Sequence, residues 1–289
     1  MAAVPFERID ADAPKLAPAN AILTVDDIVK RFETPDGVLT AVDHVSLSVA
    51  PGEFVGVIGP SGCGKSTLFN VIGGLLDGYD GTVKVAGERV RGPHPAIGMI
   101  FQEESTFPWR NVLDNVAFPL EIAGLPWAER YDRARHFVKL VGLDGFERRY
   151  PAELSGGMRQ RVSMARTLAA QPKILLMDEP FASLDEQTRL LLGDKVLQIQ
   201  QQLKQTTLLI THNITEAVQL SDRIVVMTYR PGKVKRMVEI KLPRPRSSEI
   251  VSSEAFGRYV AQIWSDLREE ASRGLDDEES RKLREGEKQ

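Results

Sequence analysis

Nine residues near position 60 combine the backbone and the side chains that bind phosphate groups. The segment Gly59–Thr67 reads GPSGCGKST and follows the apolar run Phe54–Ile58. Glycines allow a backbone to curl with its N–H groups facing inward, which makes a nest for an anion. Lys65 adds a positive charge for the β- and γ-phosphates, and the Ser66 hydroxyl is a ligand for Mg²⁺. The pattern predicts a nucleotide-binding loop that consists of Gly59, Pro60, Ser61, Gly62, Cys63, Gly64, Lys65, Ser66 and Thr67.

The residues around this loop indicate a strand before it and a helix after it. The run before it is apolar, as in a buried strand, whereas the apolar residues after it recur at helical spacing. These later residues are Leu68, Phe69, Val71, Ile72 and Leu75. A strand, a glycine-rich loop and a helix form the context that this motif needs. The helix N-terminus adds its dipole to the attraction for phosphate.

Two adjacent carboxylates, Asp178 and Glu179, directly follow another apolar run in the segment ILLMDEP. Hydrolysis of a nucleoside triphosphate needs an acid that holds Mg²⁺ and a base that orients and deprotonates water. Neighbouring side chains at a strand end point in different directions, so two residues can fill these two roles. We predict that Asp178 binds the metal and that Glu179 is the base. The alternative is a solvated turn before Pro180.

A second glycine-rich helix start occurs in the segment LSGGMRQR, residues 154–161. Ser155, Gly156 and Gly157 precede strong helix formers, so the segment offers another surface that can bind phosphate. Taken alone, a Ser-Gly-Gly sequence is usually just a helix cap. Whether this segment binds phosphate therefore has to be judged together with the other motifs of the chain.

Three short apolar runs in the second half alternate with helical patterns. They are Ile174–Met177, Leu208–Ile210 and Ile224–Met227. Such alternation predicts a parallel sheet with crossover helices. Short β-like runs dominate residues 21–58, and residues 111–170 are mainly helical in pattern.

In a parallel sheet, ligands bind outside the carboxyl ends of the strands. Asp178 and Glu179 end one predicted strand, and Thr211 and His212 follow the next. We therefore expect these four residues to face the same crevice as the nucleotide-binding loop.

Composition excludes several classes of protein. The 289 residues are 42% hydrophobic and 27% charged, with a net charge of −3, so charge gives no support to nucleic-acid binding. A single cysteine rules out a disulfide framework. Residues 1–20 are acidic and rich in proline and alanine, which predicts a disordered arm rather than a secretion signal. No stretch approaches the roughly 18 apolar residues of a membrane span. Any action at a membrane would require a partner.

Taken together, the motifs resemble the nucleotide-binding subunit of ATP-binding cassette (ABC) transporters over roughly residues 22–240. Every expected motif is present in the expected order. In chain order the motifs are Phe32, the loop 59–67, Gln102 in IFQEE, the signature-like segment Leu154–Arg161, Asp178 with Glu179, Asp185 in SLD, and His212. The resemblance implies an α/β P-loop NTPase fold: a parallel-sheet core, an N-terminal antiparallel β-subdomain and an inserted α-helical subdomain.

The resemblance also implies domain boundaries and site roles. The ATPase domain would cover 21–240, with the helical subdomain at about 103–170, and a partly helical C-terminal extension would cover 241–289. Two copies would face each other head to tail, with Ser155, Gly156 and Gly157 of one binding the γ-phosphate held by the other. The remaining roles would be adenine stacking for Phe32, contact with Mg²⁺ and water for Gln102, contact with the γ-phosphate for His212, and coupling of the two sites for Asp185.

Finer features resemble one importer branch of the family, which takes up nitrate, sulfonate, taurine or bicarbonate. These are Met158 in the signature, PWRNVLDNVAFPLE at 108–121, DEPFASLDEQTR at 178–189 and the tail from 242 to 270. The branch implies a separate membrane permease and an extracytoplasmic substrate-binding protein. The chain would then lie peripherally on the cytoplasmic face of the inner membrane. The apolar patch Phe107–Trp109 lies where the family docks the coupling helix of the permease.

Two residues depart from expectation. Met158 stands where the common signature has glutamine, and Gln160 is not a substitute, because two residues along a helix do not share a face. Cys63 precedes a helix N-terminus, where the pKa of a thiol is expected to be depressed. The plain alternative is that Cys63 is a small residue that fits.

Three other functions remain as alternatives. A non-transport ABC ATPase of repair or translation usually carries two cassettes or a long insertion between the loop and the signature, and the short distance from Lys65 to Ser155 leaves little room for one. If the chain were a P-loop kinase or a GTPase-like switch, the joint presence of Gln102, Ser155 and His212 would have no explanation. A binding module without turnover would not need Glu179.

Overall fold

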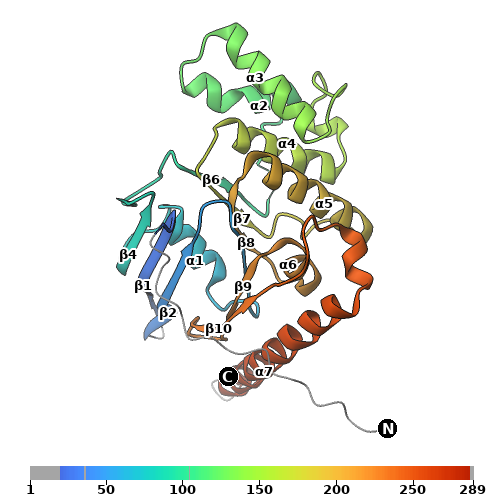
Figure 1. Cartoon of the computed structure of the whole chain (residues 1–289). Coiled ribbons are helices and arrows are strands. Elements are labelled where there is room, and N and C mark those ends of the chain that lie inside the picture. Colours follow the sequence, from blue (N-terminus) through green and yellow to red (C-terminus); the bar gives the residue numbers. More distant parts are fainter. Residues whose placement is uncertain (1–19, 36, 104, 287–289) are drawn as a thin grey trace.

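The computed structural model describes residues 20–35, 37–103 and 105–286, with side chains as far as Gly274. The predicted N-terminal arm, residues 1–20, lies outside this part of the chain except for Asn20. Two β-sheets form the body of the molecule, and helices cover their faces (Figure 1).

The central sheet has six strands in the spatial order β10-β9-β3-β8-β7-β6. All pair in parallel except β10, which runs antiparallel to β9. The bounds are β3 Phe54–Ile58, β6 Ile97–Ile100, β7 Ile174–Asp178, β8 Thr206–Ile210, β9 Arg223–Met227 and β10 Val234–Glu239. Strands far apart in sequence are neighbours here, because parallel pairing requires crossover connections. The predicted parallel sheet is confirmed.

Strand β3 is central and buried along its whole length. Val55 and Val57 pack on the face covered by the antiparallel sheet and by helix α1, Lys65–Ile72, whereas Phe54 packs on the opposite face. A strand covered on both faces is apolar throughout rather than alternating. Because β3 lies between β8 and β9, the loop that follows it opens at the carboxyl edge of the sheet.

The antiparallel sheet has the strand order β2-β1-β4-β5. Its strands are β1 Leu23–Thr34, β2 Gly37–Val49, β4 Tyr79–Val85 and β5 Glu88–Arg89, and every pairing is antiparallel. Its inner side chains share one apolar core with α1 and the central sheet. The predicted N-terminal antiparallel sheet is therefore confirmed, and β4 and β5 extend it beyond residue 58.

A group of helices is inserted between β6 and β7. It consists of α2 Val112–Ile122, α3 Trp127–Leu140, the 3₁₀ helix η1 Pro151–Glu153 and α4 Gly156–Ala169. In Figure 1 these helices, green to yellow, stand at the top of the molecule. Their apolar side chains pack against one another and against one face of the central sheet. The predicted helical insertion is confirmed.

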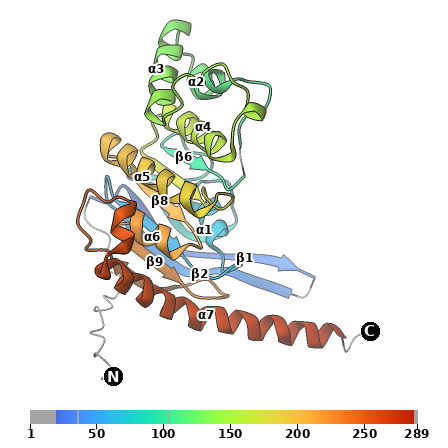
Figure 2. The same cartoon turned by 90° about the vertical axis from the view of Figure 1, so that its right-hand side faces the viewer.

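The last part of the chain alternates helices with the remaining strands and ends in a long helix. These helices are α5 Glu186–Leu203, α6 Ile214–Leu220, the 3₁₀ helix η2 Ser248–Ser252 and α7 Glu254–Gly286. Both views place α7 at the end of the molecule opposite to α2–α4 (Figures 1 and 2). Phe256, Tyr259 and Ile263 bury its first turns against α6 and β9. Across the described residues, no helix is both long and apolar enough to cross a membrane.

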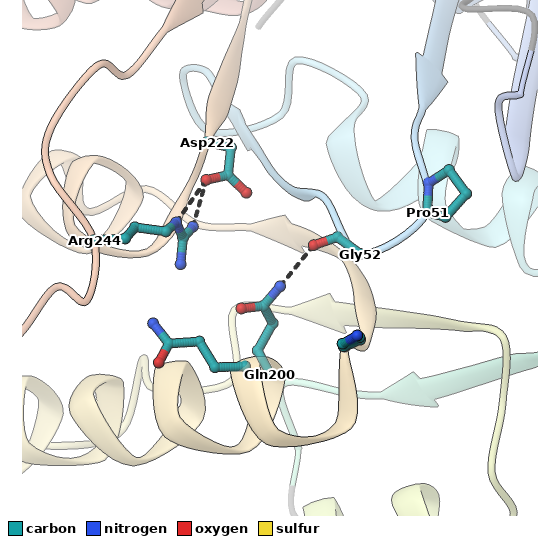
Figure 3. A pocket seen from close by; sticks show the side chains of 7 residues that line it. Pro51, Gly52, Gln200, Asp222 and Arg244 are labelled. Carbon is teal, nitrogen blue, oxygen red and sulfur yellow. Dashed lines mark hydrogen bonds and ion pairs between the residues drawn. The ribbon is translucent and has the colours of Figure 1, made fainter.

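A hollow of about 520 Å³ lies at the amino ends of β3, β8 and β9 (Figure 3). It is lined by Pro51, Gly52, Gln200, Gln201, Lys204, Asp222 and Arg244. Arg244 Nε donates to Asp222 Oδ1 at 2.8 Å, and Gln200 Nε2 donates to the Gly52 carbonyl at 2.7 Å. These contacts tie α5 and the segment after β10 to the sheet. The hollow lies at the edge of the sheet opposite to the predicted nucleotide-binding loop.

Candidate nucleotide-binding site

The segment Gly59–Thr67 consists of the loop that follows β3, residues 59–64, and the first turn of α1, which begins at Lys65. Gly64 has a φ of 97°, and a Cβ atom there would collide with the carbonyl group of Ala41. Glycine alone combines the required backbone freedom with the absence of a side chain. This approach brings β2 against the loop, so the antiparallel sheet forms one wall of the site.

Lys65 is a buried cation at the start of α1. The residue is 7% exposed, and its Nζ donates to the carbonyl oxygens of Gly59 at 2.8 Å and Pro60 at 2.9 Å. Among the described residues no carboxylate lies within the 4.0 Å ion-pair distance of Nζ. A buried ammonium whose partners are neutral carbonyls keeps a strong attraction for a phosphate anion.

Cys63 contradicts the expectation for its thiol. This residue of the loop is fully buried, and burial raises the pKa of the thiol, although attraction to Lys65 lowers it. Its Sγ lies 3.8 Å from Lys65 Nζ. The predicted depressed pKa is therefore wrong, because desolvation outweighs the nearby cation and the helix terminus. Cys63 fills space as a small residue.

A hollow of about 350 Å³ opens in front of the loop. It is lined by Phe32, Leu39, Ala41, Ser61, Gly62, Gly64, Lys65, Ser66, Thr67, Glu179 and Arg230. The hollow thus joins the aromatic residue on β1, the phosphate-binding loop, and one of the two predicted acidic residues. Sequence reasoning missed Arg230, because nothing in the segment TYRPGK indicates a ligand site.

Asp178, at the end of β7, lies beside the loop, with its Oδ1 3.4 Å from Ser66 Oγ. Burial raises the pKa of the Asp178 carboxyl, and the hydrogen bond from Ser66 opposes this rise. A hydroxyl and a carboxylate at one point are a fitting donor set for Mg²⁺. This ion prefers oxygen ligands and takes few of them from the protein when it also binds phosphates. Gln102, just past β6, is exposed.

Glu179 and His212 lie next to each other beyond the ends of β7 and β8. Glu179 Oε2 is 3.0 Å from His212 Nδ1, and the Glu179 backbone N–H donates to the Ile210 carbonyl at 2.9 Å. Glu179 has a φ of 44°, a left-handed conformation that is uncommon for a residue with a side chain. Strained backbone of this kind persists where the surrounding structure holds it, and it gathers at functional sites.

The second glycine-rich segment lies outside the hollow. Ser155 is exposed at the N-cap of α4, where its side chain accepts a hydrogen bond from the Met158 N–H at 3.4 Å, and Gly156 begins the helix. Asp185 caps α5 in a similar way by accepting from the Thr188 N–H at 2.9 Å. That hydrogen bond lowers the pKa of Asp185. Neither segment lines this hollow in its own chain.

Glu216 is a buried acid behind the His212 loop. It is 6% exposed, it accepts a hydrogen bond from Thr211 Oγ1 at 3.2 Å, and its Oε1 has no partner among the described residues. Burial raises the pKa of Glu216 to about 8. The folded chain therefore keeps this proton up to about pH 8, whereas an unfolded glutamate releases it near pH 4.3.

We expect the Glu216→Gln variant to be more stable than the parent at pH 8 and similar to it at pH 5. Because the folded state binds more protons in this window, the free energy of unfolding falls by up to about 1.4 kcal/mol for each rise of one pH unit. Glutamine stays neutral and abolishes that loss. Urea unfolding from pH 5 to pH 9 measures the difference, and a difference that does not change with pH would contradict the expectation.

The comparisons with known proteins agree with this geometry. The profile of the family described as ABC transporter matches residues 42–182. An uncharacterized ABC transporter ATP-binding protein of Methanocaldococcus jannaschii is 47% identical over 253 residues, covering 88% of this chain and 94% of that protein. The aliphatic sulfonates import ATP-binding protein SsuB of Bacillus cereus is 42% identical over 83% of this chain and 94% of its own.

Two further proteins extend the comparison. The nitrate import ATP-binding protein NrtD of Synechocystis is 42% identical over 85% of this chain and 95% of its own. A solved dimer of the ATP-binding cassette MJ0796, in a post-hydrolysis state with ADP and Pi, has a TM-score of 0.66. It is 31% identical and covers 76% of this chain and all of that one.

A P-loop ATPase with an antiparallel sheet on one side and an inserted helical region on the other is the class that this fold and site define. The chain belongs to the family of ABC transporter ATP-binding proteins.

Proposed function

We propose that this chain is the ATP-hydrolysing subunit of an ABC importer for a small anionic solute such as nitrate, sulfonate, taurine or bicarbonate. The observation that carries the ATPase part is the single hollow that joins Phe32, the loop with Lys65, and Glu179. The names of SsuB and NrtD support import over a non-transport ATPase of repair or translation. The ATPase domain would cover 21–240, and the C-terminal extension 241–289.

In this proposal the chain's own residues divide the reaction between them. Phe32 stacks on adenine, and Lys65 and the loop amides bind the phosphates. Glu179 orients water and takes its proton, while His212 holds Glu179 and contacts the γ-phosphate. Ser66 and Asp178 would hold Mg²⁺, with Gln102 as an additional ligand. When bound there, the ion neutralises charge on the phosphate oxygens.

The active form would be a head-to-tail dimer. Ser155, Gly156 and Gly157 are at a helix N-terminus that lies outside the hollow of their own chain, so they are free to complete the site of a second copy. Asp185 would contact the second copy as well. The dimeric state of the solved relatives supports this arrangement.

The membrane permease would dock on the loop before α2, which a buried asparagine fixes. Asn115 is fully buried; its Nδ2 donates to the carbonyls of Phe107, Arg110 and Asn111, and its Oδ1 accepts from the Phe107 N–H at 2.8 Å. The rigid loop presents Trp109, which is 72% exposed. An exposed, preorganised aromatic side chain is the kind of residue that anchors an interface. The chain would thereby sit on the cytoplasmic face of the inner membrane, next to a complex that also recruits an extracytoplasmic binding protein.

We expect the Trp109→Glu variant to lose copurification with its permease subunit while the isolated chain still binds ATP. A charge placed in an apolar contact is costly to desolvate, and loss of an aromatic anchor weakens an interface by about 2 kcal/mol or more, or roughly 30-fold. Affinity purification of the coexpressed complex measures the loss.

The matched control is Trp264→Glu. Trp264 is also exposed, at 59%, but it belongs to α7, the helix that lies at the end of the molecule opposite to α2–α4. We expect this variant to assemble as the parent does. Normal assembly of the Trp109→Glu variant would place the docking surface elsewhere.

A further inference from the structure

The loop 228–233 joins β9 to β10 and lies against the phosphate-binding loop. The Gly232 N–H donates to the Ala41 carbonyl at 3.1 Å, and the Gly232 carbonyl accepts from the Asp43 N–H at 3.0 Å. A Cβ atom on Gly232 would collide with the Cys63 carbonyl. The loop is thus wedged between β2 and the segment that binds phosphate, so its side chains have defined positions relative to the nucleotide hollow.

Arg230 is the residue of this loop that reaches the hollow. Its Nε donates to the carbonyl oxygen of Gly62 at 2.9 Å. It lines the hollow together with Phe32 and Lys65. One edge of the guanidinium is therefore used to hold the protein backbone, and the remaining N–H groups are available at the wall of the site.

The charges around Arg230 single it out. From Arg223 to Arg244, all basic side chains except Arg230 have a carboxylate oxygen within 4.0 Å. These pairs are Arg223–Glu53, Lys233–Asp43, Lys235–Glu270, Arg236–Asp266, Lys241–Glu239 and Arg244–Asp222. Arg230 has no such partner among the described residues. The Arg230 guanidinium thus has no anionic partner within the described part of the chain. The phosphate groups of a nucleotide bound beside it would supply one.

Helix α7 holds the loop from its other side. Glu270, which is 1% exposed, accepts a hydrogen bond from the Tyr229 N–H at 3.0 Å through Oε2, and its Oε1 is 2.8 Å from Lys235 Nζ. The Tyr229 ring packs on Gly274, where even a Cβ atom would approach it to 3.0 Å. The residue before Arg230 is therefore fixed at its backbone and its side chain, which preorganises the arginine.

We propose that Arg230 is a further nucleotide-binding residue, whose guanidinium contacts the phosphate chain of ATP bound in the hollow of the same chain. Guanidinium groups form charge-assisted, often bidentate hydrogen bonds with phosphate oxygens, and a fixed guanidinium loses little freedom on binding. The proposal rests on the proposed function of the hollow as the ATP site.

The test is titration calorimetry of Mg-ATP with the full-length chain and five variants, three of them at position 230, one at Lys233 and one at Lys65. Arg230→Ala and Arg230→Gln should each lower the affinity about tenfold or more, because both remove the charge–phosphate contact. Arg230→Lys, which keeps the charge, should lose less. Lys233→Ala is the matched control. Lys233 is a cation of the same loop, but its side chain does not line the hollow, so this variant should bind ATP with the affinity of the parent.

The glutamine variant separates a phosphate contact from mere support of the loop, because its amide can still donate to the Gly62 carbonyl. The salt dependence of ATP affinity should also become weaker in both neutral variants, since an ionic contact is lost. Parent-like affinity of Arg230→Gln, or of Arg230→Ala, would overturn the inference. Lys65→Ala serves as the reference: if it lowers affinity and the Arg230 variants do not, this inference fails alone. If Lys65→Ala binds as the parent does, the assignment of the hollow as the ATP site fails.

Discussion

The Glu179→Gln variant should bind ATP as the parent does and hydrolyse it about 10²–10⁴-fold more slowly, the usual effect of losing a general base. The amide keeps the size of the side chain and its contact with His212 Nδ1, which lies 3.0 Å from Glu179 Oε2 in the parent. The phosphate-binding loop and Lys65 are unchanged. In the proposed dimer, hydrolysis is the step that separates the two copies, so the variant should accumulate as an ATP-bound dimer.

Steady-state phosphate release and size-exclusion chromatography with ATP measure both effects. Glu239→Gln is the control, because Glu239 is an exposed acid at the end of β10, far from the loop. It should hydrolyse ATP at the parent rate and remain monomeric after turnover. Hydrolysis by the Glu179→Gln variant at the parent rate would remove Glu179 from the role of base.

The Ser155→Arg variant should bind ATP as a monomer and fail to dimerise. Ser155 is exposed at the N-cap of α4, outside the hollow of its own chain, so the substitution leaves the proposed ATP site of that chain intact. In the proposed dimer the arginine would occupy the space that the γ-phosphate of the facing copy needs. Since closure precedes chemistry, hydrolysis should stop as well, and a Glu179→Gln, Ser155→Arg double variant should be monomeric.

Ser253→Arg is the matched control for this change. Ser253 precedes α7, and its Oγ accepts from the Phe256 N–H at 3.2 Å, so the same substitution removes a similar cap at the start of another helix. Analytical ultracentrifugation with ATP should find the control dimeric and Ser155→Arg monomeric. ATP-driven dimers of Ser155→Arg would mean that the two glycine-rich helices do not share a nucleotide.

The elements that carry the site could be predicted from sequence, because each leaves a local pattern. Glycine spacing at 59–67 predicts the loop, and the apolar runs before Asp178 and Thr211 predict the strand ends. Topology then brings these ends together, since parallel strands expose their carboxyl ends at one edge. The fold class and the position of the helical insertion follow from the same patterns and from the family resemblance.

Other features of the site could not be predicted, because they depend on contacts that leave no local pattern in the sequence. The pKa of Cys63 is set by how deeply the thiol is buried, and no neighbouring residue in sequence reveals that burial. A glutamate such as Glu216 is ordinarily found on the exposed face of a helix. Here it lies on the buried face of α6 and accepts a hydrogen bond from Thr211. Arg230 meets Gly62 only because β9 is a spatial neighbour of β3. Each of these depends on tertiary packing between segments far apart in the chain.

The Ala41 carbonyl has a consequence for how much sequence change this site can tolerate. Gly64 lies close to this oxygen, and the Gly232 N–H donates a hydrogen bond to it. Three separate backbone segments therefore meet around one oxygen atom. No side chain fits at either glycine, and no rotamer change elsewhere can relieve a clash between backbone atoms. In a library of random variants these two positions should therefore be depleted together, without second-site rescue. The segment from Thr228 to Lys233 should also admit no insertion, although it joins two strands at the edge of the sheet, where loop length is ordinarily free to vary.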